Sequence, residues 1–207
     1  MLETSNGVAD KKQWSIEPRK RIFVGLALVA IISLVAVIIS LGFSSDRKES
    51  PIAIAPNESA PASVTLTEQA ATIVSKEELI AASQAIGFVI YWNGEMPDTN
   101  LELTVLTEGQ VFVRYLPKEV AAGAAEPYFT VASYYDPSGL AKVQNVGAAA
   151  GAKLVNYAGG AIAASASESD SNIYFAFDGY PVLYNIYSPD PQVGWNALET
   201  GTISILQ

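Results

Sequence analysis

The chain has 207 residues, half of them hydrophobic, and its mean hydropathy of +0.24 is high for a wholly water-soluble protein. It contains neither cysteine nor histidine, which excludes disulfides, nucleophiles activated by a histidine base and zinc sites built on the usual ligands. The formal net charge of −9 disfavours nucleic acid, because an acidic surface repels polyanions. We therefore expect no metal, no cofactor and no nucleic-acid partner.

One long apolar segment accounts for much of the hydropathy. Residues 22–43 read "IFVGLALVAIISLVAVIISLGF", with no charge and no proline. At about 1.5 Å per residue, a helix of this length crosses the ~30 Å hydrocarbon layer of a bilayer. A cleaved signal peptide is the alternative, but its apolar core would span about 7–15 residues, and "SLGFSS" is a poor cleavage site. We predict an uncleaved transmembrane helix from Ile22 to Phe43 in contact with lipid.

Basic residues orient this helix. Five precede it closely, at positions 11, 12 and 19–21, and only Arg47 and Lys48 follow closely. The positive-inside rule then places the N-terminus in the cytoplasm and the rest outside, as in a single-pass type II membrane protein. We predict four regions: a cytoplasmic tail (1–21), the transmembrane helix (22–43), a flexible spacer containing prolines (44–66) and an extracytoplasmic domain (67–207).

The external domain begins with a predicted helix. Ser75 and Glu78 have the spacing of a capping box, and Leu79, Ser83 and Ile86 then line one face until Gly87 ends the helix. The run Phe88–Asn93 has the length and apolar character of a strand.

Residues 101–116 predict a hairpin whose register depends on the turn. A two-residue turn would mix apolar and polar faces, whereas a three-residue loop at 107–109 with a left-handed Gly109 separates them. In the second register Leu103 lies opposite Val113, and Glu102 lies opposite Arg114. We expect that pair to be an ion pair on an exposed sheet face.

The remaining elements follow in chain order. Asp136 as N-cap and Pro137 at the first turn begin a helix to about Ala150, with Leu140, Val143 and Val146 facing inward. Gly159–Ser171 is small and polar and is predicted to be a loop or an irregular sheet edge. The other expected elements are strands at Phe129–Tyr135, Leu154–Tyr157, Ile173–Phe177, Val182–Tyr187 and Ile203–Ile205, and a helix from Pro189 or Pro191 to about Glu199, ended by Gly201.

Two stretches, beginning "VASYYDPSGL" and "LYNIYSPDPQ", share a plan of aromatic strand, proline-marked cap, helix and short strand. We interpret them as a decayed strand–helix–strand repeat. The predicted fold class is α+β, an antiparallel or mixed sheet with the helices on one face.

Two short motifs are better explained by chance. Ser45 and Lys48 match the S-x-x-K pair of acylating enzymes, but they lie in the spacer and lack a K-T-G partner. Asp98 begins a D-x-N-x-E series typical of calcium loops, but Leu103 and Gly109 stand where the loop needs Gly and Glu.

Aromatic residues are the more suggestive feature, because all ten tyrosines lie beyond residue 90 and several stand at strand ends beside turns. Most should be packing, since strands favour aromatics. An aromatic strip beside carboxylates would nevertheless suit sugar or peptide binding. The candidate ligand-binding residues are Tyr91, Trp92, Glu95, Tyr135 and Tyr187.

Four segments, "YWNG", "ELTVLTEGQVFVRYLP", "FTVASYYDP" and "YNIYSPDP", together resemble an uncharacterised family of single-pass membrane proteins of high-GC Gram-positive bacteria. In that family a short basic tail and one helix precede an external domain with Y-W-x-G, V-R-Y-L-P and Y-(D/S)-P elements. The resemblance covers about residues 75–207 and the architecture before them. It implies the bacterial plasma membrane and cell envelope, and it brings no known activity.

We therefore expect a non-catalytic interaction domain, anchored in the membrane, whose partner is a cell-wall glycan or an envelope protein. Two alternatives stay open. The first is a hydrolase of envelope glycans that uses carboxylates alone, such as Glu95 or Asp98, which would require two carboxyls across a cleft. The second is a structural subunit of a membrane assembly.

Overall fold

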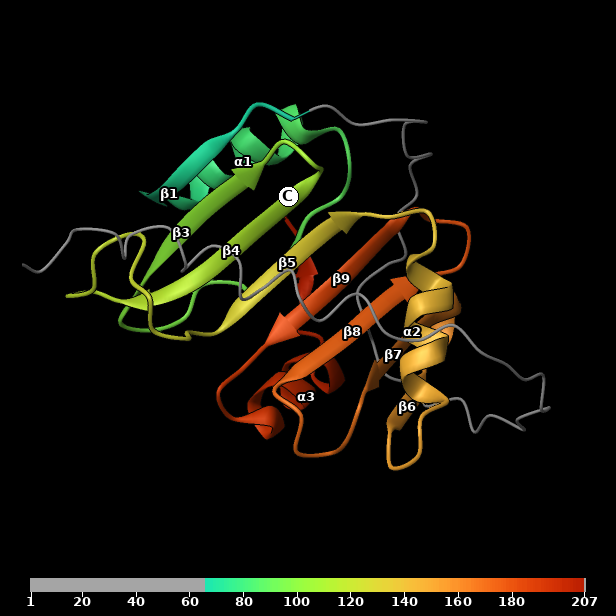
Figure 1. Cartoon of the computed structure of the whole chain (residues 1–207). Coiled ribbons are helices and arrows are strands. Elements are labelled where there is room, and N and C mark those ends of the chain that lie inside the picture. The colour runs from blue at the N-terminus through green and yellow to red at the C-terminus, as the bar shows by residue number, and fades with distance from the viewer. Residues whose placement is uncertain (1–65, 207) are drawn as a thin grey trace, which may run out of the picture. The chain divides into compact units, whose positions relative to one another are not determined.

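The computed structural model describes residues 66–206, so the predicted cytoplasmic tail, the transmembrane segment and the spacer up to residue 65 lie outside the described residues (Figure 1). Between Leu66 and Leu206, no helix is long and apolar enough to cross a membrane. The described elements are β1 (Gln69–Val74), α1 (Lys76–Ile86), β2 (Tyr91–Trp92), β3 (Thr99–Leu106), β4 (Gln110–Pro117), β5 (Thr130–Tyr135), α2 (Gly139–Gly147), β6 (Lys153–Asn156), the short 3₁₀ helix η1 (Ala158–Gly160), β7 (Ala161–Ser165), β8 (Asn172–Phe177), β9 (Val182–Tyr187), α3 (Pro191–Glu199) and β10 (Ser204–Ile205).

The centre of the domain is one eight-stranded sheet with the strand order β1-β3-β4-β5-β9-β8-β7-β6. Every neighbouring pair is antiparallel, so the α+β class is confirmed, and of the two predicted sheet types the antiparallel one is found. The two short strands β2 and β10 pair with each other in a separate ribbon.

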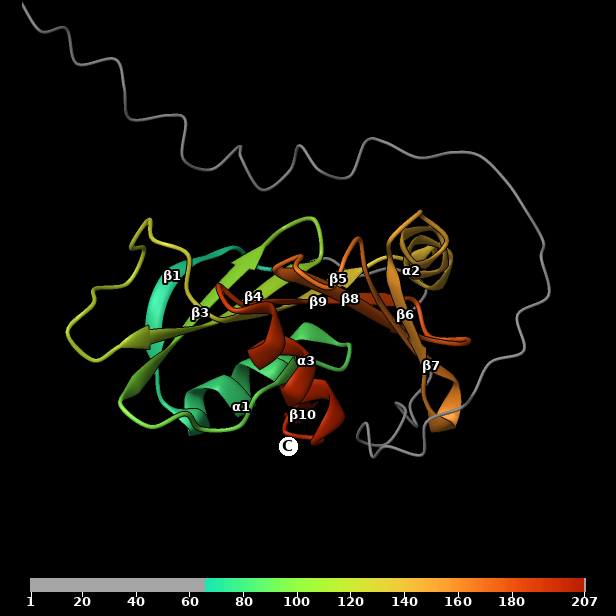
Figure 2. The same ribbon diagram turned by 90° about the horizontal axis from the view of Figure 1, so that it is seen from below.

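The helices lie on both faces of the sheet, which corrects the prediction that they share one face. Figure 2 shows α1 and α3 below the sheet and α2 above it. The contacts of the helices agree with this arrangement. Gly194 of α3 lies against Ile173 and Ile186, whereas Gly139 of α2 lies against Leu183, and Leu183 and Ile186 point to opposite faces of β9. Odd and even positions of one strand point to opposite faces, so β8 and β9 are buried on both sides.

Helix α1 forms as its sequence predicts. Ser75 is the N-cap, its hydroxyl accepts from the Glu78 backbone N–H, and the Glu78 carboxylate accepts from the Ser75 N–H at 2.7 Å. Gly87 closes the helix with a left-handed φ of 79°. Leu79 and Ile86 are buried against the sheet.

The β3–β4 hairpin has the predicted register. Leu103 lies opposite Val113 and Glu102 lies opposite Arg114. The loop has three residues, and Gly109 adopts a φ of 76°. Gly109 also lies against the end of β5, where its carbonyl accepts from the Tyr135 N–H at 2.8 Å.

Helix α2 begins two residues later than predicted. The N-cap is Ser138, and Asp136 lies before it. The Asp136 carboxylate accepts from the Ser138 N–H and hydroxyl and from Lys142 Nζ, the last at 2.6 Å. As predicted, Val143 is fully buried under the helix, with Leu140 and Val146 beside it.

The sequence pattern missed strands where side chains are small or the run is short. Residues 161–165, predicted to be a loop or an irregular edge, form the regular strand β7, in which Ala164 packs under α2 and Ala161 and Ala163 pack in the core on the other face. Of Phe88–Asn93 only Tyr91 and Trp92 form a strand. The suggested repeat is wrong at the level of topology, because β6 joins the main sheet whereas β10 pairs only with β2, and α2 and α3 lie on opposite faces.

We expect Gly109→Ala to lower the free energy of unfolding by about 3 kcal/mol, since the new methyl would combine left-handed strain with close contact. Its Cβ would lie 2.9 Å from the Tyr135 Cβ. Gly94→Ala is the matched control, because Gly94 has a φ of 63° and nothing lies within 4 Å of its would-be Cβ. Urea denaturation should give a loss of about 1 kcal/mol for the control. Equal losses for both variants would contradict the proposed contact.

The Asp136 carboxyl is expected to stabilise the fold in a pH-dependent way. Burial opposes its ionisation, but hydrogen bonds from Lys142 and Ser138 outweigh burial and hold its pKa below the ordinary value of 3.8. Because the pKa is lower in the folded than in the unfolded chain, the stabilisation is complete above about pH 5 and is lost as the pH falls through the folded pKa.

Asp136→Asn should therefore lower the free energy of unfolding by about 1 kcal/mol at pH 7 and by much less near pH 2. Urea denaturation at a series of pH values measures this difference. Asp98→Asn is the control, because Asp98 pairs with Lys118 at 3.3 Å with its side chain 92% exposed. A deficit for Asp136→Asn that is the same at every pH would rule out the ion-pair explanation.

Candidate functional site

Two of the four aromatic residues of the predicted site, Tyr91 and Trp92, lie in the core. Tyr91 has no exposed surface, and its ring contacts those of Phe175, Phe177 and Tyr184, the last at a centroid distance of 4.7 Å. Trp92 is 6% exposed and lies under the Lys76 ammonium group. A ligand-binding role for this pair is not supported, because other side chains already cover both rings.

The other three predicted residues are far from one another. Glu95 is exposed in the loop between β2 and β3. Tyr135, at the end of β5, faces the helices α1 and α3, and the centroid of its ring lies 6.2 Å from that of Phe88. Tyr187 ends β9 and lies opposite Thr130 of β5. Because Thr130 and Tyr135 are five positions apart on β5, Tyr187 and Tyr135 are about 17 Å apart along the strands and point to opposite faces of the sheet.

Tyr187 belongs to a surface that the sequence did not predict as a unit. On the α2 side of the sheet, no helix among the described elements covers β3, β4 and β5 (Figure 1). A row of residues paired between neighbouring strands crosses β4, β5, β9 and β8, and it consists of Phe112, Ala132, Asn185 and Tyr174. Tyr134 and Tyr187 point to this same face two positions along β5 and β9.

Four rings, those of Phe112, Tyr134, Tyr174 and Tyr187, thus surround two small buried residues. All four side chains are half-buried, whereas Ala132 and Asn185 beneath them are 1% and 5% exposed. We call this surface the aromatic face. Phe112 and Tyr134 meet edge to face at 5.8 Å. Burial raises the pKa of the phenols of Tyr134 and Tyr174, so both remain neutral hydrogen-bonding groups at neutral pH.

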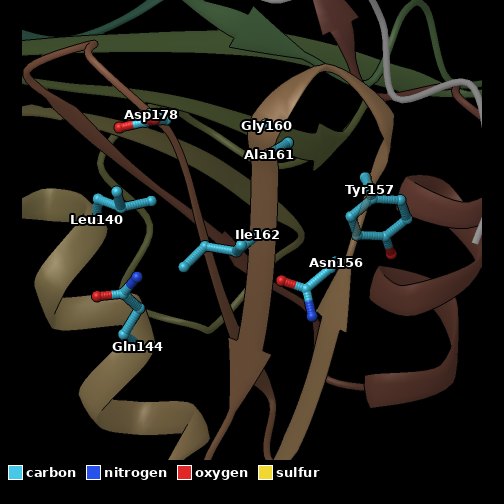
Figure 3. Close-up of a pocket in the computed structure, with 8 residues that line it drawn as sticks. All are labelled: Leu140, Gln144, Asn156, Tyr157, Gly160, Ala161, Ile162 and Asp178. Atoms are coloured by element: carbon cyan, nitrogen blue, oxygen red, sulfur yellow. The ribbon is translucent and has the colours of Figure 1, made fainter. Parts of the chain in front are cut away.

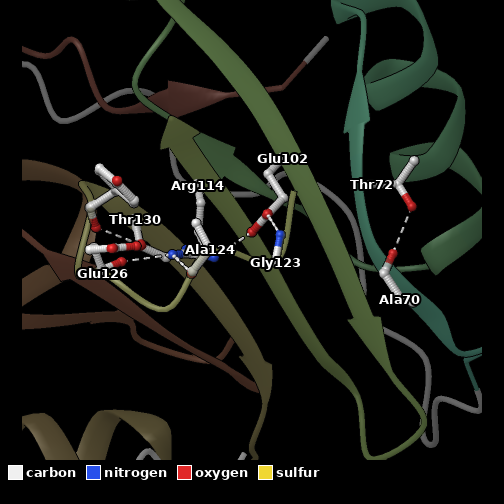
Figure 4. Close-up of polar contacts among 9 residues, drawn as sticks. Ala70, Thr72, Glu102, Arg114, Gly123, Ala124, Glu126 and Thr130 are labelled. Carbon is white, nitrogen blue, oxygen red and sulfur yellow. Dashed lines mark hydrogen bonds and ion pairs between the residues drawn. The ribbon is translucent and has the colours of Figure 1, made fainter. Parts of the chain in front are cut away.

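A buried ion pair forms one border of the aromatic face. Arg114 donates to the Glu102 carboxylate at 2.7 Å and to the carbonyls of Ala124 and Glu126, each at 2.9 Å (Figure 4). The second Glu102 oxygen accepts from the Gly123 N–H at 2.5 Å. The predicted pairing is right, but the predicted exposure is wrong, because the loop 118–129 folds over the pair and leaves Glu102 fully buried.

The ion pair at one border of the aromatic face has no net charge, and near Tyr174 the Asp170 carboxylate accepts from the Asn172 N–H at 2.9 Å. The remaining polar groups of the aromatic face are hydroxyls and amides, among them Thr130, Asn172 and Asn185. Within residues 66–206, no group of three or more acidic side chains converges in a way that could hold a metal ion. The arrangement can stack a flat ligand and donate hydrogen bonds to it.

Three of the four rings were not among the predicted site residues. Phe112, Tyr134 and Tyr174 occupy alternate strand positions opposite the apolar core, so the period-two pattern places each on the outer face. Their proximity depends on the order β4-β5-β9-β8, which sequence pattern alone does not reveal.

In comparisons with protein families, curated proteins and solved structures, no family model, no protein and no structure matches this chain. The resemblance to membrane proteins of high-GC Gram-positive bacteria therefore stays a prediction.

Arg114→Met should release the loop 118–129 and lower the free energy of unfolding by about 3 kcal/mol, because it leaves the Glu102 carboxylate buried without its cation. Urea denaturation measures the loss. Lys118→Met removes a largely exposed ion pair and should cost less than about 1 kcal/mol. Similar losses for the two variants would show that the buried pair does not hold the loop.

Proposed function

We propose that the chain is a membrane-anchored, extracytoplasmic binding protein of the bacterial cell envelope, and that its aromatic face binds an uncharged stretch of cell-wall glycan. The observation that carries this proposal is the set of four half-buried rings from four neighbouring strands, at the boundary between the part of the sheet that α2 covers and the part that no described helix covers. The anchor is the apolar segment 22–43, and the orientation follows from the basic residues before it.

The chemistry of the aromatic face favours a glycan. The C–H-bearing side of a pyranose ring is apolar and can lie flat on phenol and phenyl rings, while its hydroxyls bond to the phenolic groups and amides around it. The described domain carries five basic and fifteen acidic residues, so it repels anionic partners. At the border of the aromatic face, Glu102 and Arg114 neutralise each other and the Asp170 carboxylate lies near Tyr174, so the face suits a neutral ligand and disfavours an anion.

Binding fits this surface better than hydrolysis. Glycoside hydrolysis generally needs two carboxyls about 5–9.5 Å apart across the scissile bond. At the aromatic face the bordering carboxyl, Glu102, is buried and bound to Arg114. The carboxyls of the alternative hydrolase, Glu95 and Asp98, lie on an exposed loop, where Asp98 faces Lys118. No observation favours the structural-subunit alternative.

The test is co-sedimentation of the full-length chain, in a mild detergent, with purified peptidoglycan. Phe112→Ala combined with Tyr187→Ala should weaken binding roughly tenfold, since each stacked ring contributes about 0.5–1.5 kcal/mol. Val193→Ala is the control, because Val193 is an apolar side chain, 43% exposed, on α3 at the other face of the sheet.

Thermal unfolding of each variant shows whether the fold is retained. Wild-type affinity in the doubly substituted protein would remove the aromatic face from consideration. Absence of binding by the unaltered chain to peptidoglycan would count against the glycan as the ligand.

A further inference from the structure

A second surface, separate from the aromatic face, has the features of a small-ligand site. A hollow of about 350 Å³ lies between α2 and the end of the β6–β7 hairpin. Figure 3 shows Leu140 and Gln144 of α2 on one side, Ile162 of β7 in the middle and Asn156 of β6 beyond it, with Asp178 at the top. Its volume falls within the usual range of about 300–1,000 Å³ for small-molecule sites.

Three polar side chains line this hollow without using their hydrogen-bonding groups elsewhere. Among the described residues, neither the amides of Gln144 and Asn156 nor the Asp178 carboxylate form a side-chain hydrogen bond or ion pair. The backbone of Asp178 is fixed at the rim of the hollow, because its N–H donates to the Gly160 carbonyl at 3.2 Å, and its carboxylate is exposed. Leu140 and Ile162 supply the aliphatic part of the wall.

The charge of the hollow selects the ligand. Asp178 is the single charged residue in its lining. The nearest basic residues along the chain are engaged elsewhere: Lys142 with Asp136 at 2.6 Å, and Lys153 with Glu199 at 3.8 Å and over the Trp195 ring. The carboxylate is therefore an unpaired negative charge in a domain that already has an excess of ten acidic residues. Such a site attracts a cation and repels an anion.

We propose that this hollow binds a primary ammonium group carried on a short aliphatic stem. The ammonium donates to the exposed Asp178 carboxylate at one end of the hollow, and the amide oxygens of Gln144 and Asn156 lie beyond Leu140 and Ile162, where they accept from a second donor at the far end of the stem (Figure 3). The stem lies against Leu140 and Ile162. The site does not depend on the aromatic face, so it stands or falls independently of glycan binding.

The probe is 1,5-diaminopentane, which is fully charged at pH 7, titrated into the full-length chain in nanodiscs of neutral lipid. Binding is followed by amide chemical shifts of Asp178 and of the Gln144 and Asn156 side chains. Asp178→Asn should weaken binding about tenfold, because a charge-assisted hydrogen bond becomes a neutral one. Binding should also weaken as the salt concentration rises.

Two comparisons make the test specific. Pentan-1-ol, which has a similar stem without the charge, should bind at least tenfold more weakly. Glu108→Gln removes one acidic charge from the exposed β3–β4 turn and should leave the affinity unchanged.

The proposal is overturned if pentan-1-ol binds as tightly as the diamine, or if Asp178→Asn has no effect. It is also overturned if Glu108→Gln weakens binding as much as Asp178→Asn, since the attraction would then come from the diffuse charge of the domain. Failure of the aromatic-face variants to change peptidoglycan binding would leave this result untouched.

Discussion

The structure depends on an unequal burial of the two halves of its sheet. The strands β8 and β9 carry apolar side chains toward both α2 and α3, so they are closed on both faces. The strands β3, β4 and β5 carry a continuous apolar row only toward α1 and α3. A sheet covered on one side must present its other side to solvent or to a partner. The aromatic face occupies the boundary between these halves.

Aromatic residues have two different roles across this boundary. On the α1 and α3 side, Tyr91, Phe175, Phe177 and Tyr184 form a closed cluster with centroid distances of 4.7–6.2 Å. The Tyr184 hydroxyl donates to the Val89 carbonyl at 2.9 Å, so its polar end is also used inside the domain. On the opposite side, four half-buried rings surround Ala132 and Asn185 and retain surface for contact, although Tyr134 and Tyr174 also pack against the cluster under α2.

The buried ion pair of Glu102 and Arg114 forms a border of the aromatic face and adds no free binding group to it. Glu102 has no exposed surface, and its two oxygens are used by Arg114 and Gly123. A buried pair with satisfied hydrogen bonds adds little net stability over an apolar pair, but loss of one partner is costly. The pair therefore fixes where the loop 118–129 lies and adds no net charge to the adjoining surface.

The sequence by itself determined the local structure wherever a side chain acts on its own neighbourhood. The Ser75 and Glu78 box, the Gly109 loop and the pairing of Glu102 with Arg114 all follow from spacing and backbone preference, and the last helix begins at Pro191, one of the two prolines at which the sequence allowed it to start. It did not predict β7, because alanine and serine carry no strand signal until a helix lies close above them.

Tertiary structure alone decided which face each helix covers and which aromatic rings come together. Tyr91 and Tyr187 have similar sequence surroundings, an aromatic strand end before a turn, but one lies in the core and the other on the outer face. The physical reason is that the alternation of side chains along a strand shows which residues share one side of that strand, but not which face of the sheet that side belongs to. The strand order, set by long-range pairing, decides which neighbours share that face and whether a helix covers it.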